Sequence, residues 1–482
     1  MSIRDHLIHL YGEDAGEAAM THVERLLVDF QKRTASPSVA GPISQRDLLL
    51  ITYPDQVLED GRDPLQVLYE FLEPRIAGLV TAVHLLPFFP SSSDDGFSVV
   101  DYRSVDPAFG DWEDVSRFAE TYRLMVDAVL NHTSAGSAWF QGFCRGEEPW
   151  QDFYIAPDPQ ADWSNVIRPR STPLFTAFDT ARGPASVWTT FSADQVDLNY
   201  ANPRVLLEMV EVLLGYLRRG AQWIRLDAVG YLWKAAGSTC LHLPQTHRVV
   251  RLLRAILDQA APWARLITET NVPHVDNVAY FGAGDEAHMV YQFSLAPLIV
   301  HTLLSGDATA LTTWAQSWTV PPPGACYLNF IASHDGIGLT PTRGILDDAA
   351  LDRLMEKARA CGGVSYRTTQ AGTLQPYELN VNLLDLLSAD GSDVRRFLLA
   401  HAILLSFAGV PALYFHSLFG TRGDPQAVQR TGHLRSINRQ KLDRIELESE
   451  LATAGSIRAR IFEGLGGLIR ARQSLEALDP SA

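Results

Sequence analysis

The sequence predicts an α/β fold in which eight parallel strands and the helices that follow them close into a (β/α)8 barrel. Eight short apolar runs alternate with stretches of helical periodicity, which indicates repeated βαβ units. The length of 482 residues suits a barrel with large insertions, because a plain barrel needs about 250. Polar residues follow several of the runs, at the strand ends where barrel enzymes carry their catalytic groups. An open, doubly wound sheet is the competing architecture, and the number of runs favours the barrel.

Residues 1–46 are predicted to form a helical extension on the outside of the barrel. A loop rich in Ser, Pro and Gly, at residues 34–44, separates the extension from the first strand. Within residues 1–34 the apolar positions recur at helical spacing: Leu7, Leu10, Leu26, Leu27 and Phe30.

The barrel itself is assigned to residues 47–134 and 199–482. Helical stretches between its apolar runs supply the crossovers that parallel strands require. The predicted strands are 48–53, 80–86, 124–130, 222–227, 265–269, 289–293, 327–332 and 410–415.

Two connections are too long to be simple loops. Residues 135–198, rich in Trp, Phe and Tyr, follow the third strand and are predicted to form an inserted domain B. Residues 336–390 follow the seventh strand and form a second insertion within the barrel domain. Long insertions at the carboxyl ends of barrel strands commonly build a substrate pocket, although a purely structural role is the alternative.

The composition excludes several classes of partner. A net charge of −16 argues against nucleic acids and anionic membranes, although a few arginines inside a pocket can still attract a small anion. The amino terminus has no signal-peptide pattern, and no run of about 18 apolar residues predicts a membrane span. The four cysteines form no CxxC motif, so we expect free thiols and a cytoplasmic location.

Charged side chains at the ends of three predicted strands suggest acid–base chemistry on a sugar. Strand alternation places Arg225 and Asp227 on one face, and the arginine keeps the carboxylate ionised, as a nucleophile requires. Glu269, on the next strand, can approach the opposite side of a bound sugar. If the two carboxyl groups lie about 5–5.5 Å apart, double displacement with retention follows. Asp335, after the seventh strand, could hold sugar hydroxyls.

Each segment alone also has a structural explanation. Arg225 and Asp227 alone are equally well explained as a structural ion pair, and Asn131-His132 after the third strand is alone better explained as a capping pair. Their joint occurrence on strands three, four, five and seven favours an active site. The two carboxylates carry the charge and the proton transfers, so we expect neither a metal nor another cofactor.

These four segments resemble the four sequence signatures of glycoside hydrolase family 13, the α-amylase superfamily, over residues 45–475. Further segments resemble its sucrose phosphorylase branch, which transfers glucose from an α-glucoside to inorganic phosphate. The segments that carry this narrower resemblance are Val83–Pro90, Asp95–Ser98 with Asp101-Tyr102, Arg225–Tyr231 and Ser333–Gly338.

The resemblance implies Asp227 as nucleophile, Glu269 as general acid/base and Asp335 as stabiliser of the transition state. It also implies that Arg170 contacts phosphate with Tyr377 as its partner, which agrees with the preference of phosphate for bidentate arginine. The side chains that it implies for substrate binding are Asp94, Phe97, His132, Phe191, Gln195, Arg225, His334 and Arg435.

Within this branch, residues 93–98, 268–274 and 366–380 most resemble the glucosylglycerate phosphorylases. Sucrose phosphorylases have a histidine where Asn271 stands. The implied reaction is reversible phosphorolysis of 2-O-α-D-glucosyl-D-glycerate to α-D-glucose 1-phosphate and D-glycerate. A carboxylate-bearing acceptor needs a cation, for which Arg343 and Arg367 are candidates.

Several alternatives stay open. Sucrose, sucrose-6-phosphate and glucosylglycerol phosphorylases use the same catalytic carboxylates with other acceptors. A hydrolase or transglucosylase would also use these carboxylates. A non-catalytic barrel is disfavoured because all three carboxylates are present. Family members usually continue into a β-rich C-terminal domain, which we expect to be absent because the sequence ends where that domain would begin. The expected partners are a small α-glucoside and phosphate, and the expected assembly is a monomer or homodimer.

Overall fold

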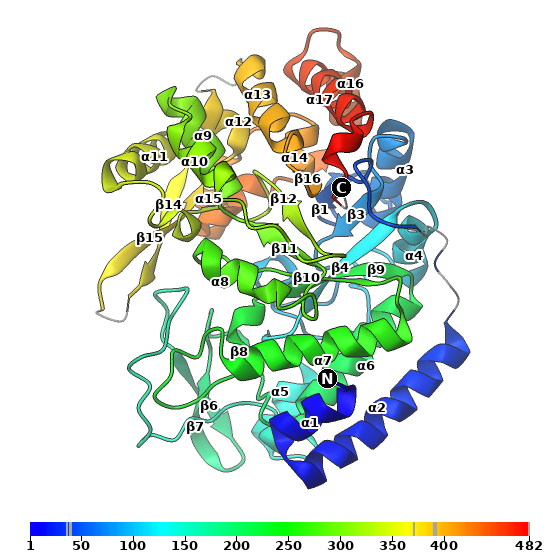
Figure 1. Cartoon of the computed structure of the whole chain (residues 1–482), viewed down its shortest axis with the longest axis vertical. Helices are drawn as coiled ribbons and strands as arrows, with labels where there is room; N and C mark the ends of the chain where they lie inside the picture. Colours follow the sequence, from blue (N-terminus) through cyan, green and yellow to red (C-terminus); the bar gives the residue numbers. More distant parts are fainter. Residues whose placement is uncertain (35–36, 38–40, 370–371, 389–392, 481–482) are drawn as a thin grey trace.

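Eight parallel strands close into a barrel in the computed structural model of the chain, which confirms the predicted fold class (Figure 1). The structure describes residues 1–34, 37, 41–369, 372–388 and 393–480, so short parts of the predicted 1–46, 336–390 and 199–482 segments lie outside it. Each strand overlaps one of the eight predicted runs. In spatial order they are β1 (Leu49–Thr52), β3 (Ala82–Leu85), β4 (Arg123–Val129), β9 (Ala221–Asp227), β10 (Arg265–Thr268), β11 (Met289–Gln292), β12 (Cys326–Asn329) and β16 (Val410–Tyr414), which pairs back on β1.

The barrel strands are buried along almost their whole length, except for the half-buried Arg265 at the start of β10, because side chains fill the interior and helices cover the outside. Every residue of β4 and β9 is buried, which explains why these strands are mainly apolar and do not alternate between apolar and polar residues. The helices around the barrel are α3 (Pro64–Ile76), α4 (Trp112–Thr121), α6 (Pro203–Arg218), α7 (Pro244–Ala260), α8 (His274–Val278), α9 (Leu295–Ser305), α10 (Thr309–Gln316), α13 (Val394–Leu405), α14 (Phe415–Leu418), α15 (Pro425–Thr431), α16 (Arg444–Ala452) and α17 (Ile457–Gln473).

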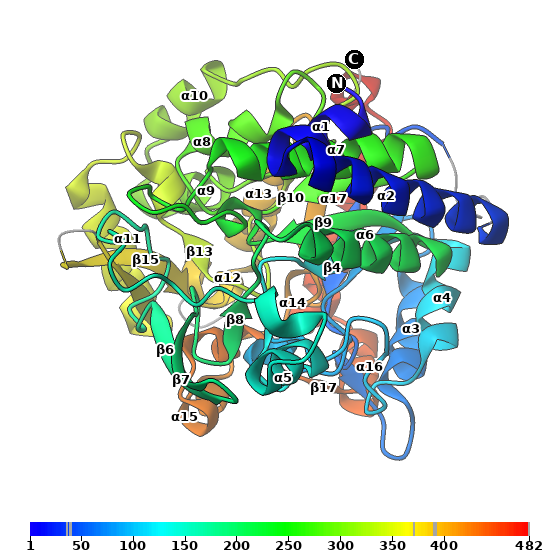
Figure 2. The same cartoon turned by 90° about the horizontal axis from the view of Figure 1, so that it is seen from below.

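The amino-terminal residues form two helices, α1 (Ile3–Tyr11) and α2 (Glu13–Arg33), that pack on α7 and α6 (Figure 2). Ser2 and Asp5 form a capping box at the start of α1. Gly12 separates the two helices with a φ of +82°, a conformation that L side chains rarely adopt. The apolar face of α2 is covered by the barrel helices, so its leucines and Phe30 contribute to the common core.

Domain B follows β4. It contains β5 (His132–Ser134), α5 (Ala138–Arg145), the antiparallel hairpin of β6 (Phe175–Thr180) and β7 (Gly183–Trp188), and β8 (Gln195–Asp197), which pairs with β5. Its aromatic side chains form a cluster in which Phe140 packs edge-on against Tyr154 and Phe178.

The insertion after β12 forms a second small sheet of three strands in the order β13 (Ile337–Gly338), β15 (Leu374–Asn380) and β14 (Gly363–Thr368). Helices α11 (Asp348–Cys361) and α12 (Leu383–Leu387) flank it. The β6–β7 and β14–β15 hairpins lie at the same edge of the molecule in both views (Figures 1 and 2). The two insertions therefore meet over the carboxyl ends of the barrel strands.

A buried lysine ties domain B to the barrel. The Lys234 ammonium, 3% exposed, forms an ion pair of 2.6 Å with Asp197 on β8. It also donates to Asn131 Oδ1, after β4, at 2.9 Å and to the carbonyl of Tyr231, after β9. Three segments that are distant in sequence are thus held by one cation.

Candidate active site

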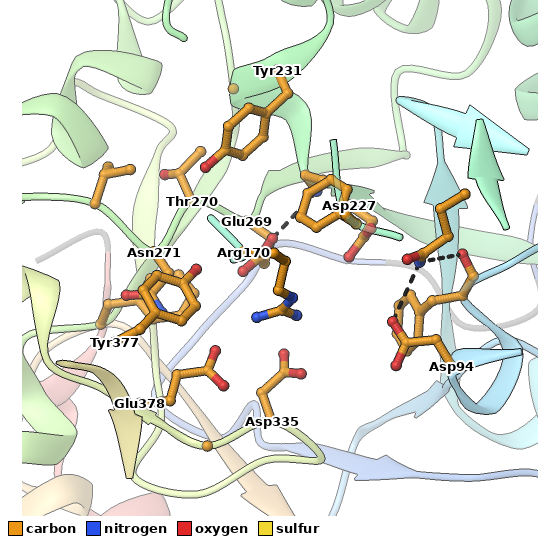
Figure 3. A pocket seen from close by; sticks show the side chains of 18 of the residues that line it. Asp94, Arg170, Asp227, Tyr231, Glu269, Thr270, Asn271, Asp335, Tyr377 and Glu378 are labelled. Atoms are coloured by element: carbon orange, nitrogen blue, oxygen red, sulfur yellow. Dashed lines mark hydrogen bonds between the residues drawn. The ribbon is translucent and has the colours of Figure 1, made fainter. Parts of the chain in front are cut away.

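A pocket with about 730 Å³ of empty space, the open solvent at its mouth included, lies at the carboxyl ends of the barrel strands, between the two insertions (Figure 3). It contains side chains from β9, from the segments that follow β3, β4, β10, β12 and β16, and from domain B and β15. Twelve of the fifteen side chains predicted from the sequence line it: Asp94, Phe97, His132, Arg170, Phe191, Gln195, Asp227, Glu269, His334, Asp335, Tyr377 and Arg435.

Arg225 lies beneath the floor of this pocket and contacts two of its carboxylates. The side chains of Arg225 and Asp227 point to the same side of β9, and their Nη1 and Oδ1 atoms are 2.8 Å apart. Glu269 follows β10, whose Ile267 is in register with Arg225, and its Oε2 lies 3.9 Å from Arg225 Nη2. Two carboxyl groups from neighbouring strands therefore face the pocket around one buried guanidinium.

Asp127 and His84 complete a buried network below Arg225. The Arg225 guanidinium also donates to Asp127 Oδ1, and the other oxygen of this carboxylate lies 2.8 Å from His84 Nε2. Burial alone would raise the pKa of Asp127, but Arg225 and His84 outweigh it and lower the pKa to about 2. The sequence contained a signal for this residue, because Asp127 is the one charged residue in the apolar run 124–130, and strand pairing then places it opposite Arg225.

The two central carboxyl groups differ in their protonation. Burial raises the pKa of Glu269 to about 7, with only partial compensation by Arg225. Burial also raises the pKa of Asp227, but the direct ion pair with Arg225 opposes it. The shorter contact with Arg225 therefore favours the charged form of Asp227, while Glu269 holds a proton more readily. This is the division that a general acid and a nucleophile need.

Asp335 lies within a cluster of arginines. Its Oδ1 forms an ion pair of 2.6 Å with Arg435, which in turn donates to Glu378 Oε1 at 2.7 Å. Burial would raise the pKa of Asp335, but Arg435 and neighbouring cations outweigh it and hold the pKa well below its ordinary value. Asp335 is consequently ionised throughout the neutral range.

Arg439 is a site residue that sequence reasoning did not select. It forms ion pairs with Asp95 and, at 3.5 Å, with Asp94 Oδ1, and its Nε donates to the carbonyl of His334 at 3.0 Å. Arg439 follows the 3-10 turn Leu434–Asn438, where strand alternation gives no indication of direction.

Aromatic rings and polar tips line the end of the pocket around Asp94. The Phe97 and His334 rings stack with centroids 5.0 Å apart, and the His132 and Phe191 rings lie 5.2 Å apart. Gln195 donates to Asp94 Oδ2 at 3.3 Å. Apolar ring faces beside carboxylate and imidazole groups suit a sugar, which has both apolar faces and hydroxyl edges.

The backbone at this end is held in an unusual conformation. Asp94 and Asp95 have φ values of +54° and +47°, which are uncommon for residues other than glycine. The next residue, Gly96, could not carry a side chain, because a Cβ would lie 2.7 Å from the carbonyl oxygen of Pro87. The ion pair between Asp95 and Arg439 stabilises this turn, as expected for strain at a functional site.

Arg170 and Tyr377 meet at the outer end of the pocket. The Arg170 guanidinium lies 5.8 Å from the centre of the Tyr377 ring and 6.0 Å from that of Phe191. Figure 3 shows the guanidinium pointing into the pocket. Within the described ranges, no carboxylate oxygen lies within 4.0 Å of it. A cation without an internal counterion thus faces a pocket whose inner part is lined by carboxylates.

Arg343 and Arg367 do not line the pocket, unlike Arg170 and Arg435. Both donate to the same atom, Oε1 of Gln375, and Arg367 does so at 3.3 Å. The cause is strand pairing, since Arg367 on β14 lies directly opposite Gln375 on β15. Pocket residues that the prediction omitted are Ala228, Gly230, Tyr231, Leu241, His242, Thr270, Asn271, Val272, Phe293, Gly336 and Glu378.

No group of three or more His, Cys, Asp or Glu side chains in the described part of the chain is arranged to hold a metal ion. No helix among the same residues is long and apolar enough to cross a bilayer.

Comparisons with known proteins agree on one family. The alpha amylase catalytic domain matches residues 76–336. The glucosylglycerate phosphorylase of Allomeiothermus silvanus is 48% identical over 100% of this chain and 87% of its own length. That of Spirochaeta thermophila is 47% identical over 99% of this chain and 83% of its own length.

A solved structure is also similar over most of the chain. The sucrose 6F-phosphate phosphorylase from Thermoanaerobacter thermosaccharolyticum aligns with a TM-score of 0.79 at 25% identity. The alignment covers 92% of this chain and 89% of that protein.

Proposed function

This chain belongs to the alpha-amylase family and, within it, to the glucosylglycerate phosphorylases, and we propose that it interconverts 2-O-α-D-glucosyl-D-glycerate and α-D-glucose 1-phosphate. Inorganic phosphate is the second substrate and D-glycerate the second product. The enzyme is a glucosyl-transferring phosphorylase that retains the anomeric configuration. No cofactor takes part, because the carboxyl groups of the pocket supply the nucleophile and the proton.

In the first half-reaction, Glu269 and Asp227 act on opposite sides of the glycosidic bond. Glu269, protonated near neutral pH, donates its proton to the glycosidic oxygen. Asp227 attacks C1, the C1–O bond breaks, and glycerate leaves with the proton. Asp335 stabilises the positively charged transition state by binding glucose hydroxyls as an ionised carboxylate.

In the second half-reaction, phosphate occupies the space that glycerate has left. A phosphate oxygen attacks C1, the bond from C1 to Asp227 breaks, and Glu269 takes up the phosphate proton. Glu269 thus regains the proton that it gave to glycerate. Two inversions at C1 give net retention.

The position of Arg170 in the pocket is the observation that most supports a phosphorylase. The attacking group is an anion in both directions, phosphate in one and glycerate in the other. Arg170 is a pocket-lining cation without a carboxylate within 4.0 Å among the described residues, so its charge is available for an anionic substrate. A hydrolase, whose nucleophile is neutral water, has no need of such a cation. We further propose that the enzyme works in the cytoplasm as a monomer or homodimer.

The reverse reaction tests the proposal. α-D-Glucose 1-phosphate is incubated with glycerate, glycerol, fructose or fructose 6-phosphate, and phosphate release is measured, with Asp227→Asn as the blank. We expect release to be fastest with glycerate and absent in the variant. Release with another acceptor alone would replace glycerate as the substrate. Release of glucose at the same rate without any acceptor would indicate a hydrolase.

A further inference from the structure

Two guanidinium groups converge on one neutral oxygen at the edge of the pocket. Arg343 and Arg367 both donate an Nη2 hydrogen to Oε1 of Gln375. Arg343 is exposed and Arg367 is half-buried. Two like charges that share one uncharged acceptor repel each other, and an anion bound between them would relieve this repulsion.

The described residues provide no such anion. Neither guanidinium has a carboxylate oxygen within 4.0 Å among these residues, whereas Arg225, Arg435 and Arg439, at the inner part of the site, each have at least two. Burial and the charge of Arg367 both lower the pKa of Arg343. The pair is therefore an uncompensated centre of positive charge in a protein whose net charge is −16.

The pair lies next to the pocket. Gln375 precedes the pocket-lining Tyr377 by two residues on β15, a separation of about 7 Å along a strand. On the other wall, burial raises the pKa of Tyr231, and Arg367 is the cation that opposes this rise most. The field of Arg367 thus extends into the pocket, although its side chain does not line it.

We propose that Arg343, Arg367 and Gln375 form an outer anion-binding site that captures small carboxylates and phosphates at the pocket entrance. The two guanidinium forks supply the charge and the bidentate donors. Because Gln375 directs its oxygen towards the arginines, its amide N–H groups stay free to donate to the anion. The site rests on the proposed function in one respect, since phosphate and glycerate are the anions that it would deliver.

Capture at this site changes the rate at which anionic substrates reach the pocket, and it does not change the rate of the chemical step. A protein of net charge −16 repels anions at long range, and a local cationic site reverses the field where the substrate enters. Loss of the site should therefore lower kcat/KM for anionic substrates and leave kcat unchanged. The effect should decrease as salt screens the charges.

Kinetics of charge-neutralised variants test the proposal. Arg343→Gln, Arg367→Gln and the double variant are compared with Arg359→Gln, a matched control on α11 whose Nη2 donates to Tyr366. In the double variant we expect kcat/KM for phosphate and for glycerate to fall about tenfold at low salt, within the range known for electrostatic steering. Transfer from α-glucosyl fluoride to glycerol, both uncharged, should proceed at the original rate. An equal loss in Arg359→Gln, or an equal loss with the uncharged pair, would overturn the proposal.

Direct binding separates this site from the proposed reaction. In the Arg170→Gln background, which weakens the pocket itself, inorganic phosphate is titrated and its ³¹P signal is followed. We expect binding to persist in that background and to disappear when Arg343 and Arg367 are also changed to Gln. Failure of phosphorolysis in the unchanged enzyme, with phosphate binding to the outer site intact, would refute the proposed function alone. Absence of phosphate binding in Arg170→Gln would refute the outer site.

Discussion

At the scale of single residues, the position of one proton decides what the pocket does. Asp227 has the 2.8 Å contact with Arg225, while Glu269 Oε2 lies 3.9 Å from the same guanidinium. The carboxyl group with the weaker partner therefore keeps the proton. Sequence alternation predicted the first contact, but the second depends on how β10 sits beside β9, which only the assembled barrel defines.

The raised pKa of Glu269 predicts how the free energy of unfolding depends on pH. Its ordinary value in an unfolded chain is about 4.3, and the folded protein raises it to about 7. Between these values the folded state binds more protons than the unfolded state, so this residue lowers the free energy of unfolding as pH rises through that window. We expect Glu269→Gln to match the wild-type Tm near pH 4 and to exceed it by roughly a few degrees at pH 8.

Thermal denaturation across this pH range measures the effect, with Glu448→Gln on α16 as the control. The same variant should lose phosphorolysis at every pH, because it has no proton to donate. A constant difference in Tm from pH 4 to pH 8 would show that Glu269 is not the group that titrates.

The residues of the candidate site could be predicted where the local sequence determines the direction in which a side chain points. Asp227 is the last residue of β9, Glu269 directly follows β10, and Asp335 lies in the loop after β12, where the chain turns towards the pocket. Arg439 lies beyond a 3-10 turn, and Arg367 on β14 is opposite Gln375 because of strand pairing across an irregular register. Neither direction follows from periodicity. The resemblance to the α-amylase superfamily is confirmed, and it supplied the pocket residues that the pattern alone could not.

At the scale of elements, the attachment of domain B depends on one buried ion pair. Lys234 is 3% exposed and Asp197 is fully buried, and Asp197 also accepts hydrogen bonds from Thr190 and Asn131. Removing one partner of a buried pair leaves an uncompensated charge. This contact holds domain B, and with it Phe191 and Gln195, against the end of β4.

We expect Lys234→Met to destabilise the protein by about 3–5 kcal/mol and to reduce kcat/KM, because Asp197 would be left buried and unpaired. Combining it with Asp197→Asn should restore part of both. Denaturation and proteolysis within residues 135–198 measure the change. Equal Tm and kcat/KM in Lys234→Met and wild type would show that the pair does not anchor domain B.

The barrel strands and the small sheet of the second insertion differ in how far they could be predicted. The barrel strands appear as apolar runs because both of their faces are buried. The strands β14 and β15 are half-exposed and mixed in character, and their pairing is determined by contacts outside the hairpin. The sequence therefore indicated an insertion at residues 336–390 but not its sheet.

At the scale of the whole molecule, α1 and α2 add an outer layer that takes no part in the pocket. Leu27 on α2 is 3% exposed, while the adjacent Val28 is 50% exposed. Leu27→Ala should lower the free energy of unfolding by about 2–5 kcal/mol, since it removes buried methyl groups and leaves a cavity. Val28→Ala should have little effect on stability. Urea denaturation compares the two variants.

We expect kcat to be unchanged in Leu27→Ala under conditions where the protein stays folded, because no residue of α2 lines the pocket. A loss of kcat without a loss of stability would instead indicate that the outer layer influences the reaction.

The closure of β16 on β1 has a consequence in time. A ribosome delivers the chain from its amino end at about 5–20 residues per second. Asp95 cannot form its ion pair until Arg439, 344 positions later, has been synthesised, which takes roughly 20–70 seconds. During that interval β1 pairs with β3 alone, and its other edge stays open until β16 emerges. The end of the pocket around Asp94 is therefore among the last parts of a nascent chain that can form.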